Sequence, residues 1–164
     1  ETANTSRDSA CSVGLVRVSD WQVKESMVAL IKPPTNEFEF TYIHGITWEN
    51  VKDKPRFDEV WPKIQKFISS ADYLVAHNAP FDKGVMESCC RTYGLHPPKT
   101  EWQCTLNLAR SAWTFPDNKL STVCKHLGIA LNHHEALSDA RACAEILIKG
   151  RKFLENNTSG RIAP

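Results

Sequence analysis

The sequence of 164 residues lacks several features that would place it in a class of proteins at once. No apolar run approaches the roughly 20 residues that cross a bilayer, so we expect no membrane span. The first residues, ETANTSRDSACS, hold no apolar segment of the kind found in a secretory signal. Neither charge is in excess, since 20 Lys and Arg face 19 Asp and Glu for a net charge of +1. A uniformly basic nucleic-acid-binding domain is therefore excluded, and any such binding needs a local site.

The six cysteines lack the spacing of a disulfide scaffold or a zinc site. No CxxC pair occurs, and most of them stand among apolar neighbours: Cys11, Cys89, Cys90, Cys104, Cys124 and Cys143. We expect buried, unpaired thiols in a reducing compartment, which favours a cytoplasmic location. An enzyme that depends on zinc or on a thiol is the less favoured alternative.

What remains is the composition of one ordinary globular domain, with 41% hydrophobic and 24% charged residues. Apolar and β-branched runs predict a hairpin of strands over 11–18 and 22–31 and a buried strand over 73–76. A short alternating segment or loop covers 38–43. The predicted helices cover 57–70, 81–93, 105–113, 120–127 and 136–154. This order predicts a single α/β domain over residues 1–155 and a flexible tail over 156–164.

Three polar segments carry candidate chemistry: Glu1-Thr2, the run His77-Asn78-Ala79-Pro80-Phe81-Asp82, and His134 with Asp139 five residues later. Each has an ordinary structural explanation. A carboxylate such as Asp82 stabilises the first turn of a helix, Asn78 suits a helix N-cap, and Asp139 suits a solvated helix. His133 and His134, side by side in a loop, are typical of a protein surface.

Taken together, the same segments point to metal-dependent chemistry. Carboxylates at a strand end, at the next helix start and on the last helix can converge at one edge of a sheet. Such oxygen ligands suit Mg²⁺ or Mn²⁺ rather than zinc. Two such ions about 3.5–4 Å apart can hold a scissile phosphate, and a nearby histidine can accept the proton of the attacking water.

At this point the sequence resembles the DEDDh branch of the DnaQ-like 3′–5′ exonucleases, the group of the proofreading subunit of bacterial DNA polymerase III. The second family motif matches the run from His77 to Asp82, and the third matches His134-Glu135-Ala136-Leu137-Ser138-Asp139. The segment Ile43-His44-Gly45-Ile46-Thr47 resembles the family's substrate-contacting turn. Cys104-Thr105-Leu106 resembles a helix entry in which the family commonly has Asp in place of Cys104. The resemblance covers nearly the whole chain.

The resemblance implies a ribonuclease H-like mixed sheet flanked by helices. It implies that Glu1, Asp82 and Asp139 bind two divalent cations, Mg²⁺ or Mn²⁺, and that His134 is the general base. Substrate contacts are implied for Thr2, Ile43, His44 and Asn78. The implied reaction is hydrolysis at the 3′ end of single-stranded DNA or RNA, which releases nucleoside 5′-monophosphates. A polymerase or repair partner is implied as well.

One departure from the family concerns its first motif, Asp-x-Glu-Thr, which ends the first strand. Here Glu1-Thr2 match its second half, and the Asp and most of that strand are not in the sequence. We expect a longer protein in which that Asp is present. If Glu1 is the true start, one ligand is lost and a charged α-amine disfavours the cations. The alternative function is then a catalytically inactive domain that binds nucleic acid or protein.

Overall fold

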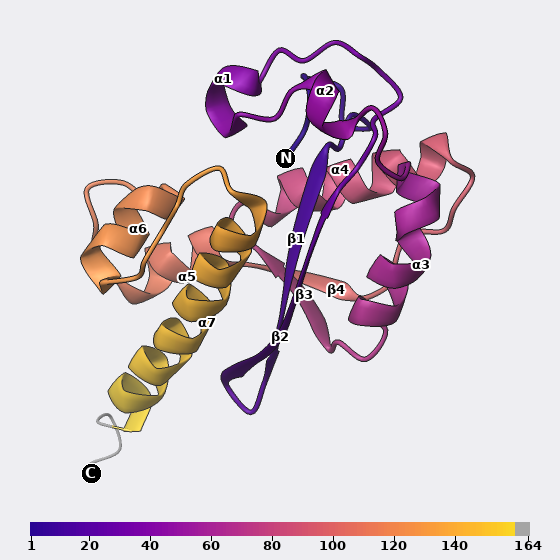
Figure 1. Ribbon diagram of the computed structural model, residues 1–164. Helices are drawn as coiled ribbons and strands as arrows, with labels where there is room; N and C mark the ends of the chain where they lie inside the picture. Colours follow the sequence, from indigo (N-terminus) through magenta and orange to yellow (C-terminus); the bar gives the residue numbers. More distant parts are fainter. Residues whose placement is uncertain (160–164) are drawn as a thin grey trace.

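The computed structural model describes residues 1–159, with side chains described through 155, and shows an α/β arrangement (Figure 1). Its strands are β1 (Ser12–Ser19), β2 (Gln22–Leu30), β3 (Tyr73–Ala76) and β4 (Glu101–Cys104). Its helices are α1 (Thr41–His44), α2 (Trp48–Val51), α3 (Phe57–Ile68), α4 (Ala79–Thr92), α5 (Thr105–Ala112), α6 (Leu120–Leu127) and α7 (Ala136–Ser159). The predicted α/β class is confirmed, and no helix within the described part has the length and apolar character to cross a membrane.

The first two strands form the predicted hairpin. β1 pairs antiparallel with β2, from Ser12 opposite Leu30 to Ser19 opposite Gln22. The two turn residues, Asp20 and Trp21, both have positive φ, at 53° and 58°. A two-residue turn of this kind matches the right-handed twist of the strands that it joins. Asp20 tolerates this conformation, whereas a bulky residue such as Trp21 seldom adopts it, so the turn residues alone do not specify the hairpin.

The other two strands form a parallel pair, with α4 as the crossover between them. Tyr73 lies opposite Glu101, and Ala76 lies opposite Cys104. The sequence pattern predicted β3 but missed β4, because the segment EWQC has no run of apolar residues. Within residues 1–159 the strands form two two-stranded sheets, one antiparallel and one parallel, and this agrees with the mixed arrangement of strands that we expected with most of the first strand missing.

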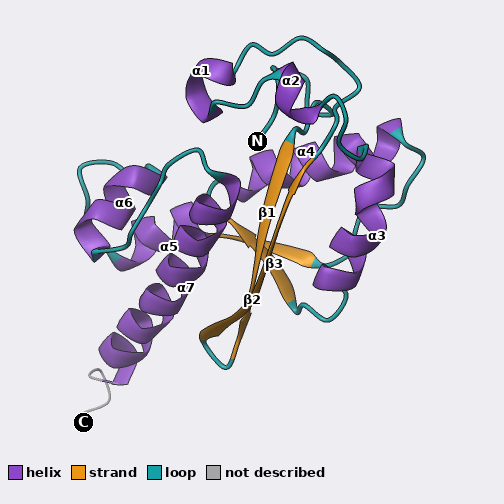
Figure 2. Ribbon diagram, in the orientation of Figure 1, coloured by secondary structure: helices purple, strands orange, loops and turns teal. Residues whose placement is uncertain are grey.

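Helices lie on both sides of the strands (Figure 2). On one side, α3 and α4 pack against the hairpin through a cluster that includes Ile31, Trp61, Ile64 and Cys90. On the other side, α5, α6 and α7 share a second cluster around Val123 and Ile146.

Five of the six cysteines are buried and all six are unpaired, as predicted. Burial raises the pKa of the Cys11, Cys89, Cys90 and Cys124 thiols to about 11 and that of Cys143 to about 12. At neutral pH these thiols are therefore protonated, which makes them poor nucleophiles and poor metal ligands.

The first turn of α7 crosses β1 at very short range. A Cβ atom on Gly14 would lie 2.2 Å from the backbone oxygen of Ala136, so only glycine allows this approach. The helix then continues to Ser159. Our prediction of a flexible tail from 156 onward is thus wrong for 156–159, where the chain stays helical, and 160–164 lie outside the described residues.

Candidate active site

The strand β3 ends at a histidine that holds three segments together. His77 follows β3, and its Nε2 atom lies 2.8 Å from the backbone oxygen of Asn118 while its Nδ1 atom lies 3.0 Å from Oγ1 of Thr105. Because a carbonyl oxygen only accepts, Nε2 donates and Nδ1 accepts from the hydroxyl. Burial lowers the pKa of His77, so the ring is neutral at neutral pH. Its role is to fix the start of α5 and the loop before α6.

The next residue turns the chain into α4. Asn78 is the N-cap residue, with a left-handed φ of 71°, and its side chain makes no capping hydrogen bond. Our prediction of the cap position is confirmed, whereas the capping bond is not made. Pro80 follows in the first turn, where its missing N–H costs nothing. Arg7 Nη1 donates to the Pro80 carbonyl at 3.3 Å and so ties this turn to the amino-terminal segment.

Asp82, in the first turn of α4, has a perturbed carboxyl group. Neighbouring protein atoms displace water from this carboxyl group, and the desolvation is the largest cause of the rise in its pKa from 3.8 to about 6. The carboxylates of Glu1 and Asp139 raise it further, while the α-amino group of Glu1 lowers it. Part of the side chain is still exposed, so water also screens this group. Burial is thus the main cause of the shift, and the smaller contributions of Glu1 and Asp139 show that two further carboxylates lie near Asp82, a grouping that suits a divalent cation.

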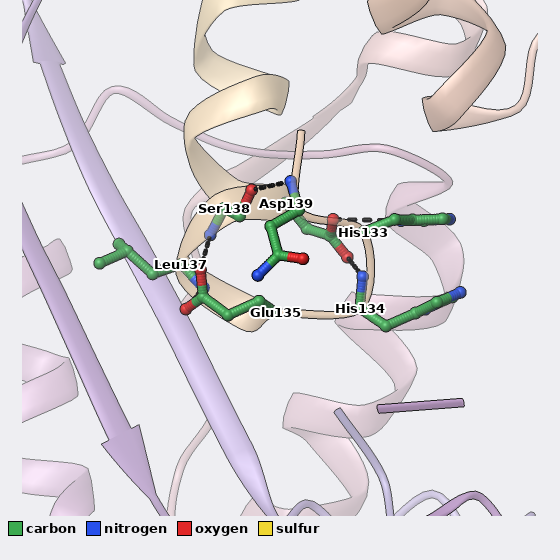
Figure 3. A network of polar contacts seen from close by, with 7 residues as sticks. His133, His134, Glu135, Leu137, Ser138 and Asp139 are labelled. Carbon is green, nitrogen blue, oxygen red and sulfur yellow. Dashed lines mark hydrogen bonds and ion pairs between the residues drawn. The ribbon is translucent and has the colours of Figure 1, made fainter. Parts of the chain in front are cut away.

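The start of α7 is a closely hydrogen-bonded loop (Figure 3). The backbone N–H of His134 donates to Oδ2 of Asp139 at 3.2 Å, and His133 Nδ1 lies 3.2 Å from Oδ1 of the same carboxylate. Both oxygens of Asp139 are therefore contacted by two neighbouring residues of the loop before the helix. His134 has a left-handed φ of 67°, and its ring stacks on that of His133 with centroids 3.8 Å apart.

Two further hydrogen bonds brace this loop. The N–H of Ser138 donates to Oε2 of Glu135 at 3.1 Å, and the N–H of Asn132 donates to Oγ of Ser138 at 2.8 Å. The loop is thus held at both ends by the first turn of α7. Asp139 is not the freely solvated helix residue of the ordinary explanation.

The amino-terminal residues lie beside the first strand. Thr2 is buried and pairs with Ala10 in an isolated bridge, and the Glu1 carbonyl accepts the N–H of Cys11 at 2.9 Å. His44 Nε2 lies 3.0 Å from the Thr2 carbonyl, and His44 Nδ1 accepts the N–H of Ile46 at 3.0 Å. His44 is therefore the tautomer with its proton on Nε2, and both of its nitrogens are used within the protein.

Ile43, the residue before His44, has an exposed side chain, whereas the His44 ring is held by hydrogen bonds within the protein. Ile43 belongs to the short helix α1, which replaces part of the loop expected over 38–43. Gly45 ends α1 with a φ of 73°, a conformation that glycine adopts without strain. The turn that carries Ile43 is thus held by His44 against the amino-terminal segment.

The structure brings several of the predicted site residues together. Asp82 senses the charges of Glu1 and Asp139, which places the three predicted metal-binding carboxylates around one region. Among the residues that the structure describes, one group of three has ligand atoms all within 4.8 Å of one another, and it is His133, His134 and Asp139. Nothing in the sequence indicated a role for His133 beyond its position next to His134.

The comparisons with known proteins agree with this arrangement. The sequence profile of the RNase_T family, described as exonuclease, matches residues 2–147. The chain is 37% identical over 151 residues to a DNA polymerase III PolC-type of Clostridium perfringens, covering 88% of this chain and 10% of that protein. It is 38% identical over 113 residues to the DNA polymerase III subunit epsilon of Haemophilus influenzae, covering 65% of this chain and 43% of that protein.

A solved structure of exonuclease X in complex with 5′ overhanging duplex DNA superposes with a TM-score of 0.71 at 29% identity. The match covers 93% of this chain and 86% of that one. The chain spans about a tenth of the PolC-type relative and less than half of the epsilon subunit. Since the family profile matches most of its length, the chain belongs to the RNase_T exonuclease family, the DnaQ-like DEDDh nucleases that its motifs resemble.

Proposed function

We propose that this domain hydrolyses phosphodiester bonds at the 3′ end of single-stranded DNA or RNA and releases nucleoside 5′-monophosphates. The observation that carries the proposal is that Glu1, Asp82 and Asp139 come from separate parts of the chain, yet the charges of Glu1 and Asp139 both add to the larger effect of burial on the pKa of Asp82. Both carboxylates therefore repel a charge on Asp82. A folded protein tolerates such repulsion where cations relieve it.

The residues present fit divalent cations. Glu1, Asp82 and Asp139 offer hard oxygen ligands, which Mg²⁺ and Mn²⁺ prefer. We propose that these three residues hold two such ions. When bound, the ions polarise the phosphate and stabilise the charge on the attacking and leaving oxygens. The protein contributes the fixed positions of the carboxylates at the starts of α4 and α7.

His134 is the proposed general base. Its backbone N–H is bonded to Asp139, so the residue is anchored through the main chain and its ring is left to act. An imidazole accepts a proton readily near neutral pH, and it must lie beside the water that it activates. The anchor keeps the ring within reach of the carboxylate that holds the cations.

The proposed substrate contacts of Ile43 and His44 use side-chain surfaces that are not already engaged in contacts within the protein. The exposed side chain of Ile43 can contact the terminal base. His44 acts by fixing that turn, since both of its ring nitrogens are occupied, and only its ring face is left for a nucleotide. We propose Thr2, whose carbonyl oxygen lies 3.0 Å from His44 Nε2, and Asn78, at the start of α4, as further contacts. The names of the relatives favour a polymerase partner and a cytoplasmic site of action.

The test is the digestion of single-stranded oligonucleotides in Mg²⁺ or Mn²⁺. A 5′-labelled strand should shorten one nucleotide at a time, whereas a 3′-labelled strand should lose its label first as a mononucleotide. Asp82→Ala and Asp139→Ala should each abolish the reaction and keep the circular dichroism spectrum. Asp72→Ala, an exposed carboxylate between α3 and β3, is the matched control and should retain activity.

Matched DNA and RNA strands of one sequence assign the substrate class. Full activity in the Asp82 or Asp139 variant would contradict the site. Binding of the oligonucleotide without cleavage by the unaltered protein would support the inactive binding domain instead.

A further inference from the structure

We propose that His133, His134 and Asp139 form a binding site for a borderline transition-metal ion such as Zn²⁺, and that an ion bound there inhibits the nuclease. The binding stands on the geometry of the loop alone. The inhibition rests on the proposed function, because it requires His134 to be the general base.

The donor set differs from that of the proposed catalytic ions. Two imidazoles and one carboxylate offer ligand atoms within 4.8 Å of one another. Imidazole nitrogen suits Zn²⁺, Ni²⁺ and Co²⁺, whereas Mg²⁺ prefers oxygen ligands only. The same loop can therefore select a different metal from the carboxylates around Asp82.

The distances suit an ion between His133 and Asp139. Nδ1 of His133 and Oδ1 of Asp139 are 3.2 Å apart. Two ligands bonded to Zn²⁺ in tetrahedral geometry, at about 2.0–2.1 Å each, lie about 3.3 Å from one another. An ion can thus replace the shared proton of the present hydrogen bond with little movement of either side chain. His133 is exposed, so the ion can enter from solvent.

The third ligand lies beside the first and has to turn to reach the same ion. The His134 ring stacks on the His133 ring with 23° between their planes, and because an imidazole lone pair lies in the plane of its ring, rotation of the His134 side chain is needed to aim its nitrogen at the ion. Figure 3 shows both rings extending from the loop in the same direction, with the Asp139 carboxylate at their base. The hydrogen bonds of Glu135 and Ser138 fix the loop before any ion arrives, so binding orders few additional groups.

Occupancy of this site has a chemical consequence. A nitrogen lone pair that binds a metal ion cannot accept a proton from water. An ion shared with Asp139 also removes one oxygen ligand from the proposed catalytic cations. Micromolar Zn²⁺ should therefore inhibit the enzyme in the presence of millimolar Mg²⁺, since the imidazoles give Zn²⁺ the higher affinity.

The first experiment measures binding without any activity. Co²⁺ serves as the probe, because its visible absorption reports imidazole ligands and low coordination number. The full chain, in excess Mg²⁺, should bind one Co²⁺ with such a spectrum, and Zn²⁺ should displace it. The informative variant is His133→Asn, whose amide can still donate to Asp139 but is not a transition-metal ligand.

We expect His133→Asn to weaken Zn²⁺ binding by more than the roughly 10–100-fold that follows from losing an outer-shell partner of a ligand. His96→Asn, an exposed histidine in the loop before β4, is the matched control and should leave affinity unchanged. The second experiment measures nuclease inhibition. Relative to its own activity in Mg²⁺ alone, His133→Asn should require at least about tenfold more Zn²⁺ for half inhibition than the unaltered protein.

The outcomes separate the two proposals. A Co²⁺ spectrum without imidazole ligands, or equal Zn²⁺ affinity in the His133 and His96 variants, overturns the metal site. Inhibition of both variants at the same Zn²⁺ concentration overturns the inhibitory role. A spectrum that depends on His133 in a protein without nuclease activity upholds the metal site and counts against the proposed function alone.

Discussion

Replacing Asp82 with Asn should stabilise the metal-free protein while it abolishes nuclease activity. The carboxyl group of Asp82 has a pKa of about 6 in the folded protein, against an ordinary value of 3.8. Between these two pH values the unfolded chain loses the proton and the folded protein keeps it. Stability therefore falls as pH rises from about 4 to about 6 and stays reduced above that range. An amide at this position carries no charge and avoids the loss.

The size of the effect follows from the same pKa values. The difference between 3.8 and about 6 corresponds to an upper limit of about 3 kcal/mol. Because the side chain is partly exposed, water screens the charge, and about 1–1.5 kcal/mol is the reasonable expectation. For a domain of this size that gain raises the melting temperature by about 2–6 °C.

Urea or thermal unfolding in EDTA at pH 7.5 and pH 4.5 measures this gain. Asp82→Asn should be more stable than the unaltered protein at pH 7.5, and the difference should shrink at pH 4.5. Asp72→Asn, on an exposed carboxylate, is the control and should change stability little at either pH. Addition of Mg²⁺ at pH 7.5 should stabilise the unaltered protein more than the Asp82 variant. A variant that is less stable at pH 7.5, or equally stabilised at both pH values, would refute the electrostatic account.

Three further predictions concern the residues around this site. His134→Ala should lower turnover by about 10²–10⁴ with little loss of Mg²⁺ binding, whereas His133→Ala should do much less; steady-state kinetics and metal titration decide it. Gly14→Ala should cost about 1–3 kcal/mol and lower activity, because its Cβ would meet the backbone of α7 at 2.2 Å. Gly84→Ala meets only the flexible end of an arginine side chain and should be tolerated in the same unfolding assay. His77→Ala should cost about 1–3 kcal/mol, since it leaves a carbonyl and a hydroxyl without their partner, and an unchanged melting temperature would contradict that role.

Local sequence signals were sufficient for much of the framework. The run YLVA predicted β3 with its observed bounds, and Leu120 to Leu127 with the following Gly128 predicted α6 likewise. Pro80 indicated that a helix begins near residue 80, where α4 starts. These elements are specified by their own residues, through apolar runs, restricted φ angles and left-handed stops. The order of motifs also indicated the family that the comparisons identify.

Long-range contacts decided what no local pattern could show. The strand β4 forms where Glu101–Cys104 pairs with β3, since its alternation of polar and apolar residues spans only four positions. Gly14 lies inside β1, and only the approach of α7 explains the glycine there. His77 is a partly buried link to Asn118, a residue 41 positions away.

The features of the candidate site also fall into those that local sequence signals specify and those that long-range contacts create. Local patterns indicated which carboxylates and which histidine stand at the starts of α4 and α7, because helix starts are signalled locally. The effect of Glu1 and Asp139 on the pKa of Asp82, and the contact of both His133 and His134 with the Asp139 carboxylate, arise only in the folded chain. Charge interactions and ligand geometry depend on distances through space, and the folded chain alone sets those distances.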